Sequence, residues 1–269
     1  MESIEFKKYT GAGNDFIMIN NYTDKYNIDY EKTARILCPR GTAVGADGLI
    51  AVEKCEKSDF RMIYFNSDGS RAEMCGNGGR CVAMFAFREG IAGKRMSFET
   101  DAGIHSAEIM KDEVKLEMVP PDGYEQMCIE IEEGEVQGYY INTGVPHFII
   151  FDYPEGNIKE RGSEIRYHKR FAPKGTNVDF VRVDNKGKIS IRTYERGVED
   201  ETLACGTGSV AAALISNVLK KTEGKISIET KSKVVLKVEA EVTEKGFRDV
   251  FLQGEAREIY SGRTGRDVV

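Results

Sequence analysis

The sequence predicts an α+β fold made of two pseudo-symmetric domains, each a mixed or antiparallel sheet wrapped around a central apolar helix. Its β-like segments occur in runs rather than in alternation with helices, which favours α+β over a doubly wound parallel sheet. Two segments that follow glycine turns, residues 81–87 and 209–215, are apolar on nearly every side, as buried helices are. The stretches around these two segments resemble each other, which indicates that one architecture is used twice.

The internal repeat is clearest around Cys75 and Cys205. Each cysteine stands directly before a glycine turn, CGNGG in the first copy and CGTG in the second, and each turn leads into one of the apolar helices. The pentapeptides MSFET and ISIET follow the two cysteines at the same distance. Upstream, residues 13–17 (GNDFI) resemble residues 176–181 (TNVDFV), with one residue added. We interpret this self-similarity as an internal duplication.

The sequence PPDG at residues 120–123 is the strongest candidate for a boundary between the two halves, because proline and glycine interrupt regular structure. We therefore expect a first domain over residues 1–120 and a second over residues 121–254, with one cysteine–glycine motif in each. The polar tail, residues 255–269, is expected to join the first domain.

The first domain begins with an alternating strand at residues 4–9, a glycine loop and a second strand at residues 15–20. Asp29 is a suitable N-cap for a helix over residues 30–37, and the apolar helix after Cys75 is expected to end near residue 90. Aromatic, β-branched and alternating runs predict further strands at residues 49–53, 59–65, 96–100, 104–110 and 114–118.

The second domain is expected to hold a helix over residues 155–166, although Gly156 and Gly162 lower its helix propensity, and the apolar helix that follows Cys205. The turn former DNKG at residues 184–187 separates two of its strands. The same strand patterns occur at residues 128–131, 136–142, 147–152, 177–183, 189–194, 226–230, 234–242 and 250–252.

Composition describes a soluble, globular and acidic protein. Apolar residues make up 41% of the chain and charged residues 30%, and a net charge of −6 argues against nucleic acid as a partner. No apolar run approaches the roughly 18 residues of a membrane span. The N-terminus reads as an alternating strand rather than a signal peptide. We therefore expect a cytoplasmic protein with no membrane partner.

Cysteine and histidine usage indicates neither a disulfide framework nor a metal site. None of the six cysteines has C-x-x-C spacing, the three histidines are scattered, and a chain of this length can bury a core without disulfides. The glycine loops match neither the Walker pattern nor G-x-G-x-x-G. We expect structural roles for Cys38, Cys55, Cys81 and Cys128.

Two cysteines at helix N-termini point to proton transfer at carbon. Unpaired N–H groups and the helix dipole favour an anion at such a place and lower the pKa of a thiol. Two related halves packed about a pseudo-dyad would place Cys75 and Cys205 across one cleft, where one thiolate removes a proton and the opposite thiol returns one. The N–H groups near Gly76 and Gly206 could hold a substrate carboxylate and stabilise the charge that flows into it. A racemase without pyridoxal phosphate or another cofactor needs this help.

Four sequence blocks resemble the diaminopimelate epimerase family. They are GAGNDF at residues 11–16, GADG at 45–48, NSDGS through MCGNG at 66–78, and ERG through CGTG at 195–208, in the family's order. Each block alone is weak, but together they are specific and span nearly the whole chain. The resemblance implies a cofactor-independent isomerase that interconverts LL-2,6-diaminopimelate and meso-diaminopimelate, in lysine and peptidoglycan precursor biosynthesis. It also implies a cytoplasmic homodimer with a small amino-acid substrate.

The resemblance assigns roles residue by residue. Cys75 and Cys205 fall on the two acid/base cysteines, and His147 and Glu195 fall on residues that tune the thiols. An arginine suits a distal carboxylate bidentately, and asparagine and glutamate side chains can bind an ammonium group. The implied substrate contacts are Asn14, Asn66, Gly76, Asn77, Asn177, Glu195, Arg196, Gly206 and Thr207.

Three features depart from the common family pattern. Many members have asparagine where this chain has Val145, some have glutamine where it has Gly48, and the loop at residues 198–202 is one residue longer. These departures bear on how the substrate is positioned more than on the chemistry.

A racemase of the same superfamily that acts on proline, hydroxyproline or histidine is the nearest alternative. Proline racemases have histidine where Asn77 stands, and Arg196 with Asn66 and Asn177 favours a substrate with two amino-acid ends. A phenazine-type isomerase is a weaker alternative, because such relatives generally lack the paired cysteines. A thiol–disulfide redox protein or a non-catalytic binding module is an alternative of a different class, which predicts reversible cysteine pairing and no exchange of substrate α-protons.

Single residues also have structural explanations. A lone cysteine before a glycine turn is usually a small buried hydrophobe. Asn14 and Asn66 can shape turns, the pair Glu195–Arg196 can be a solvated ion pair, and His147 can be a satisfied core histidine.

Overall fold

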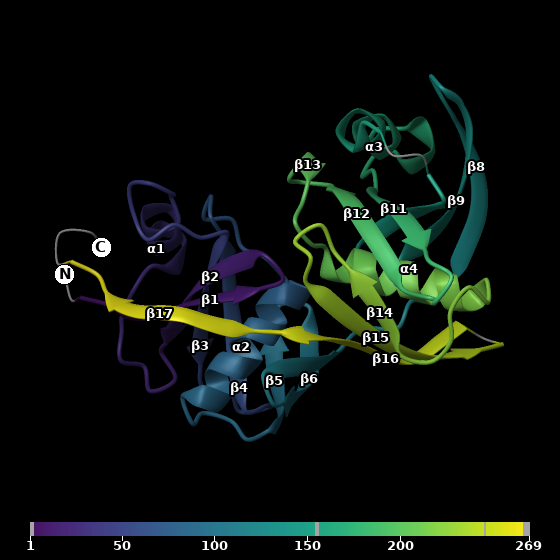
Figure 1. Cartoon of the computed structure of the whole chain (residues 1–269). Coiled ribbons are helices and arrows are strands. Elements are labelled where there is room, and N and C mark those ends of the chain that lie inside the picture. The colour runs from purple at the N-terminus through teal and green to yellow at the C-terminus, as the bar shows by residue number, and fades with distance from the viewer. Residues whose placement is uncertain (1–2, 154–155, 245, 266–269) are drawn as a thin grey trace. The chain divides into compact units, whose positions relative to one another are not determined.

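The computed structural model describes residues 3–153, 156–244 and 246–265, and the chain divides into two compact units (Figure 1). Unit 1 comprises Met1–Leu116 and Gly254–Val269, and unit 2 comprises Glu117–Gln253. Each unit combines a mixed sheet with a few helices, so the α+β prediction is confirmed.

The sheet of unit 1 begins with a strand from the C-terminal end of the chain. β17 (Arg257–Arg263) pairs antiparallel with β1 (Glu5–Gly11), and β1 pairs antiparallel with β2 (Asn14–Asn20). The β2–β3 and β4–β5 pairs are parallel, whereas β3–β4, β5–β6 and β6–β7 are antiparallel. The sheet continues from β2 through β3 (Gly48–Glu53), β4 (Phe60–Asn66), β5 (Arg95–Thr100), β6 (Gly103–Met110) and β7 (Glu113–Glu117).

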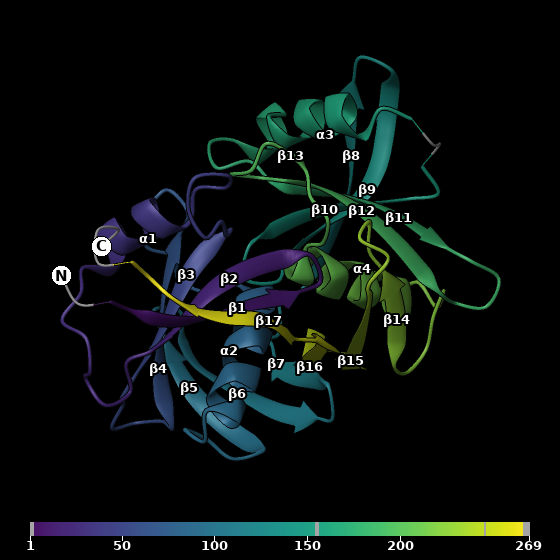
Figure 2. The ribbon, with the colours of Figure 1, turned by 60° about the vertical axis from the view of Figure 1, so that its left-hand side comes forward.

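Two helices of unit 1 occupy different environments. α1 (Tyr30–Leu37) begins as predicted, with Asp29 Oδ1 accepting from the Lys32 N–H at 3.0 Å, and packs on β3 and β4. α2 (Gly76–Arg88) is buried from its first residue to Ala86 and contacts β1, β2, β3, β6 and β17. Because β17 and β6 lie near opposite ends of the sheet, the sheet must curve around α2 to reach it (Figure 2). A helix so enclosed is largely apolar, and within its buried part α2 departs from this only at Asn77 and Arg80.

Unit 2 repeats this plan. α4 (Gly206–Val218) is buried over most of its length and contacts β9, β10, β11, β12, β14 and β15. α3 (Ile158–Arg166) packs on β11, β12 and the short β13 (Asp200–Glu201), and a 3-10 turn follows at Lys169–Phe171. The sheet runs in the order β8 (Tyr124–Ile131), β9 (Gly134–Asn142), β10 (Pro146–Phe151), β11 (Asn177–Val183), β12 (Ile189–Glu195), β14 (Ile226–Glu229), β15 (Val235–Thr243) and β16 (Gly246–Glu255).

The two units share one pattern of strand pairing. From β17 to β7 in unit 1, and from β8 to β16 in unit 2, the pairs are antiparallel, antiparallel, parallel, antiparallel, parallel, antiparallel and antiparallel. This alignment equates α2 with α4 and Cys75 with Cys205, as an internal duplication requires.

The upstream part of the predicted repeat is wrong. Matching residues 13–17 with 176–181 equates β2 with β11, whereas the pairing pattern equates β2 with β10 and β3 with β11. The error has a physical reason, because β2 and β11 are both central strands buried on both faces. Such strands have similar apolar composition whatever their place in the sheet.

The remaining differences concern segments with weak patterns. β17 was expected only as a polar tail, and its mostly exposed side chains give it no apolar alternation. β16 is longer than the predicted residues 250–252. α3 begins at Ile158 after the N-cap Asn157, and the predicted start at residue 155 lies outside the described residues. Gly162 lies inside α3, and close packing explains why it is glycine, because a Cβ there would lie 2.4 Å from Tyr194 Cβ.

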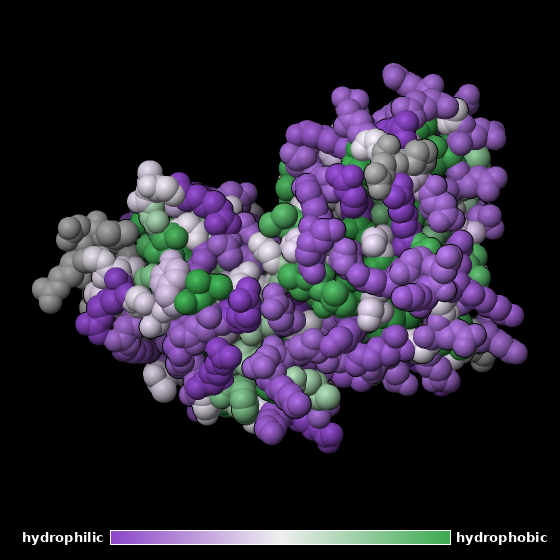
Figure 3. Space-filling model, in the orientation of Figure 1, coloured by the Kyte–Doolittle hydropathy of each residue, from purple (hydrophilic) through white to green (hydrophobic). Residues whose placement is uncertain are grey.

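The surface agrees with the acidic, charged composition. Figure 3 shows a face that is mostly hydrophilic, with apolar side chains gathered in small patches. Over the parts of the chain that the structure describes, no helix is long and apolar enough to cross a membrane.

Candidate active site

The first candidate site lies at the N-terminus of α2. Cys75 is the N-cap residue, with an extended backbone (φ −141°, ψ 125°), and its side chain is half-buried. No acidic residue stands in the first turn, so nothing there opposes an anion. The glycines allow close packing, since a Cβ at Gly79 would lie 2.6 Å from Met74 Cε. The turn is therefore packed tightly while its N–H groups point out of the helix end.

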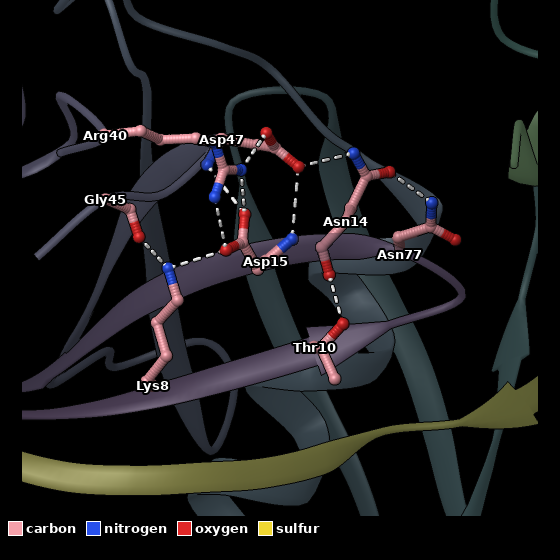
Figure 4. Close-up of polar contacts among 8 residues, drawn as sticks. All are labelled: Lys8, Thr10, Asn14, Asp15, Arg40, Gly45, Asp47 and Asn77. Atoms are coloured by element: carbon pink, nitrogen blue, oxygen red, sulfur yellow. Dashed lines mark hydrogen bonds and ion pairs between the residues drawn. The ribbon is translucent and has the colours of Figure 1, made fainter. Parts of the chain in front are cut away.

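A chain of side-chain amides runs from this turn to a carboxylate (Figure 4). Asn77, buried in the first turn, donates through Nδ2 to Asn14 Oδ1 at 2.5 Å. Asn14 in turn donates through Nδ2 to Asp47 Oδ2 at 2.9 Å. Two asparagines predicted as substrate contacts thus lie together, and Asp47, which was not predicted, orients them.

Beside this chain, an ion-pair cluster fixes the start of β2. Asp15 accepts from Arg40 at 2.6 Å and pairs with the buried Lys8 at 2.8 Å, and Arg40 also pairs with Asp47 (Figure 4). Burial alone would raise the pKa of Asp15, but hydrogen bonds from Arg40 and Lys8 outweigh it and lower that pKa to about 2. The cluster is therefore charged at neutral pH and holds the loop that carries Asp47.

Arg80 belongs to α2 and follows its first turn. Its side chain is wholly buried, and its guanidinium donates to Asn77 Oδ1 at 2.6 Å and to the Gly76 carbonyl at 3.3 Å. Arg80 was not among the predicted site residues. Its spacing of three from Asn77 on one helix was the available signal.

The remaining asparagine predicted as a substrate contact in unit 1, Asn66, lies at the end of β4. The Asn66 backbone N–H donates to the Ser70 carbonyl at 2.9 Å, and its Nδ2 donates to Ser70 Oγ at 3.0 Å, so the residue also shapes its turn. Gly48 pairs with Asn66 across the sheet, and a Cβ there would lie 2.6 Å from the Phe65 carbonyl oxygen. The packing of this sheet therefore explains why glycine stands at position 48.

The second candidate site lies at the N-terminus of α4. Cys205 is the N-cap, is buried, and its Sγ accepts from the Gly208 N–H at 3.4 Å and lies 3.3 Å from Thr207 Oγ1. Burial raises the pKa of this thiol well above its ordinary value, and the charges of Glu195 and Asp179 add to the rise. Cys205 is therefore a thiol, not a thiolate, at neutral pH.

A hydrogen-bonded chain connects Cys205 to a buried carboxylate. His147 Nε2 lies 3.0 Å from Thr207 Oγ1, and His147 Nδ1 lies 2.6 Å from Asp179 Oδ2. A carboxylate accepts, so Nδ1 carries the proton of the His147–Asp179 hydrogen bond, and Nε2 is left to face the Thr207 hydroxyl. The hydroxyl oxygen can then accept from the Cys205 thiol. Thr193 also donates to Asp179, at 2.6 Å.

Asn177, Glu195 and Arg196 gather at the adjoining strand ends. Asn177 Oδ1 accepts from the Arg196 N–H at 2.8 Å, and its Nδ2 donates to the Pro146 carbonyl at 3.0 Å. Glu195 is the last residue of β12, next to Asn177 at the start of β11. The guanidinium of Arg196 makes a long contact, 3.5 Å, with the Lys174 carbonyl. Unit 2 therefore brings its predicted residues together. Asp179 was not predicted, although its place in the NVDF block at residues 177–180 could have indicated it.

The other cysteines differ among themselves. Burial raises the pKa of Cys38 to about 11 and that of Cys81 to about 12, as in unreactive core thiols. Cys55 donates to Glu99 at 3.3 Å, and Cys128 is exposed. Across the described residues no cluster of His, Cys, Asp and Glu could hold a metal ion.

Solved structures share this duplicated fold. A PhzF-family phenazine biosynthesis protein of Bacillus anthracis superposes with a TM-score of 0.76, covering 98% of this chain and 100% of its own, at 18% identity. A hydroxyproline epimerase of Agrobacterium vitis superposes with a TM-score of 0.74 at 15% identity, and the match covers 98% of this chain and 93% of the epimerase chain. The chain therefore has the duplicated α+β fold of these two structures.

Sequence similarity defines the family within this fold. The family model for diaminopimelate epimerase matches residues 6–122 and 139–259, and the chain belongs to the diaminopimelate epimerase family. A diaminopimelate epimerase of Aquifex aeolicus is 40% identical, covering 99% of both chains. One from a Hydrogenobaculum species is 43% identical, covering 97% of this chain and 98% of its own. The family predicted from the four sequence blocks is confirmed.

Proposed function

We propose that this protein interconverts LL-2,6-diaminopimelate and meso-diaminopimelate, without a cofactor, in the synthesis of lysine and peptidoglycan precursors. Full-length similarity to relatives with that name supports the activity. The observation that carries the chemistry is the repeated helix start: two buried helices in two related folds, each capped by a cysteine. The cytoplasm is the proposed compartment, and a homodimer is the proposed assembly.

In the proposed mechanism, Cys75 and Cys205 act on opposite faces of one α-carbon. The substrate α-carboxylate accepts hydrogen bonds from N–H groups at Gly76–Asn77 and Gly206–Thr207, which stabilise the negative charge that develops as the α-proton leaves. One sulfur takes that proton as the other delivers a proton to the opposite face, and the stereocentre inverts. Each turnover exchanges the protonation states of the two sulfurs and consumes no other reactant.

The environment of Cys205 suggests how the work is divided at rest. Because its pKa is raised, Cys205 holds its proton at rest and is the proposed proton donor. Cys75 is then the proposed base that removes the substrate α-proton. The chain from Cys205 through Thr207 and His147 to Asp179 gives the donor a fixed orientation.

The non-reacting end of the substrate needs its own contacts. We propose that Arg196 binds the distal carboxylate and that Asn66, Asn177 and Glu195 bind ammonium or carboxylate groups. Arginine suits such a carboxylate because its donors form a planar fork. We propose Asn14 as a further contact beside the first helix start, through its side-chain amide.

Incubation in deuterated water tests this function. The protein should incorporate deuterium at the α-carbon of LL-diaminopimelate, followed by mass spectrometry, and should leave proline, hydroxyproline and histidine unlabelled. Label in one of those amino acids instead would favour the related racemases. No label in any substrate, together with reversible Cys75–Cys205 disulfide formation, would favour a redox protein.

A further inference from the structure

A buried arginine behind the first helix start has no role in the mechanism described above. The Arg80 side chain is fully buried, and none of the described carboxylates lies within ion-pair distance of its guanidinium. Within the part of the chain that the structure describes, its Nε has no hydrogen-bond partner. Burial lowers the pKa of Arg80, while Cys81, Cys75 and Glu255 around it act in the opposite direction. Burying a cation without a paired anion is costly, so a fold would not retain it for packing alone.

Arg80 sets the direction of the amide chain. An arginine can only donate, so Asn77 must present its oxygen to Arg80 and its Nδ2 to Asn14. Asn14 then presents its oxygen to Asn77 and its Nδ2 to Asp47, which can only accept (Figure 4). With a donor fixed at one end and an acceptor fixed at the other, neither amide can flip without breaking two hydrogen bonds.

Arg80 also orients a backbone donor of the proposed anion site. Its second hydrogen bond goes to the Gly76 carbonyl. In a planar trans peptide the C=O of one residue and the N–H of the next point in opposite directions. Holding the Gly76 carbonyl toward Arg80 therefore aims the Asn77 N–H toward the open end of the helix, where an anion would bind.

The second copy of the fold shows that the position does not require arginine. Val210 stands in α4 where Arg80 stands in α2, five residues after the cysteine, and it is fully buried. Thr207 stands where Asn77 stands. The buried helix therefore forms with an apolar residue at this position, and the arginine accompanies the asparagine in unit 1.

We propose that Arg80 is a positioning residue that holds Asn77, Asn14 and the Gly76–Asn77 peptide in place to receive the substrate carboxylate. Its buried charge also favours an anion at this helix start. This proposal rests on the proposed function, because it assigns the α2 helix start to the substrate.

Substitution of Arg80 tests the role. Arg80→Met should lower kcat/KM for epimerisation about 100-fold, with KM rising more than kcat falls, because it disorders groups that bind the carboxylate. Arg80→Lys keeps the charge and should recover part of that loss. Wild-type kcat/KM in a folded Arg80→Met protein would overturn the proposal.

A double-mutant cycle separates positioning from general damage to the fold. If Arg80 acts through Asn77 on Asn14, then adding Arg80→Met to Asn14→Ala should lower kcat/KM by less than fivefold further, since coupled residues are non-additive. The matched control adds Arg80→Met to Asn66→Ala, a proposed substrate contact outside the amide chain. There the two losses should multiply. Multiplication in both cycles would overturn the proposal.

Folding and function are checked independently. Circular dichroism and thermal unfolding report whether each variant folds, and if Arg80→Met does not, both cycles are measured with Arg80→Lys. If the wild-type protein exchanges no α-proton of diaminopimelate, the proposed function fails. An active wild-type enzyme with additive cycles refutes only the role of Arg80.

Discussion

The first turns of α2 and α4 are two copies of one structure with different support. Both begin at an extended cysteine N-cap, both follow it with glycine, and neither has an acidic residue in the first turn. In α2 the buried Arg80 donates a hydrogen bond back to the first turn, whereas Val210 occupies the same position in α4. Beneath α4 the support is instead the buried His147–Asp179 pair, joined to the turn through Thr207.

This difference shows which features a duplicated site keeps and which it changes. The backbone N–H groups of the helix start come with the fold, so both copies retain them. The side chains beneath can diverge, and they give one helix start a cation and the other a carboxylate. Burial raises the pKa of the Cys205 thiol, and the negative charges of Glu195 and Asp179 add to the rise. This asymmetry favours one sulfur as the acid at rest, although each turnover exchanges the protonation states of the two sulfurs.

Among the substitutions predicted here, removing the sulfur of Cys75 or Cys205 should reduce epimerase activity the most. Cys75→Ala and Cys205→Ala should each lower the turnover of diaminopimelate by at least about 1,000-fold, because a general acid or base is lost from one face. Both helix starts should remain folded, since alanine fills no new space. Stereospecific turnover followed by polarimetry, with circular dichroism as the control, checks this. Full epimerase activity in either variant would refute the two-cysteine assignment.

Replacing Asp179, the buried carboxylate that supports the start of α4, should cause the next largest loss of activity. Asp179→Asn can donate to His147 Nδ1 and so stabilise the wrong tautomer, which should lower kcat by about 100-fold. Removing this negative charge should also lower the pKa of Cys205, so its alkylation by iodoacetamide, located by mass spectrometry, should begin at lower pH.

The matched control for that carboxylate is Asp47→Asn, which ends the amide chain of unit 1. It should raise KM and leave the alkylation of Cys205 unchanged. A shift of the Cys205 profile in both variants, or in neither, would contradict the assignment of separate supports to the two helix starts.

The bridging hydroxyl of Thr207 should have a smaller effect. Thr207→Val keeps the shape but removes the link between His147 and Cys205, and should lower kcat about tenfold. Thr207→Ser keeps the hydroxyl and should retain near wild-type kcat. If valine and serine give the same kcat, the hydroxyl does not connect the histidine to the thiol.

The sequence predicted the central features of this comparison because they are local. The cysteine–glycine turns, the apolar helices and the Asp29 cap are each recognisable within a few residues, and the structure has them where they were expected. The α+β class also followed, because runs of strands around buried helices have few packing solutions.

The parts that were missed depend on contacts distant in sequence. β17 is held by its pairing with β1 across nearly the whole chain, so its own residues carry no apolar signal. Asp179 and Arg80 lie within recognised blocks, but their hydrogen bonds to His147 and Asn77 appear only when the strands and the helix are assembled. The equivalence of β2 with β10 likewise requires the order of the sheet.

The ion-pair cluster at the start of β2 should have the smallest effect, and on stability rather than on chemistry. The pKa of Asp15 is lowered to about 2 in the folded protein, below its ordinary value of 3.8, so its contribution is fully present above about pH 4 and is lost as the pH falls toward 2. Asp15→Asn should remove about 1 kcal/mol of that acid dependence, less than the whole shift implies, because Arg40 is solvent-exposed and water screens its ion pair with Asp15. Urea unfolding of wild type and variant at pH 7, 4 and 2.5 measures it. The difference in stability between the two proteins should be largest at pH 7 and clearly smaller at pH 2.5, and a constant difference across this range would exclude the cluster as a source of acid sensitivity.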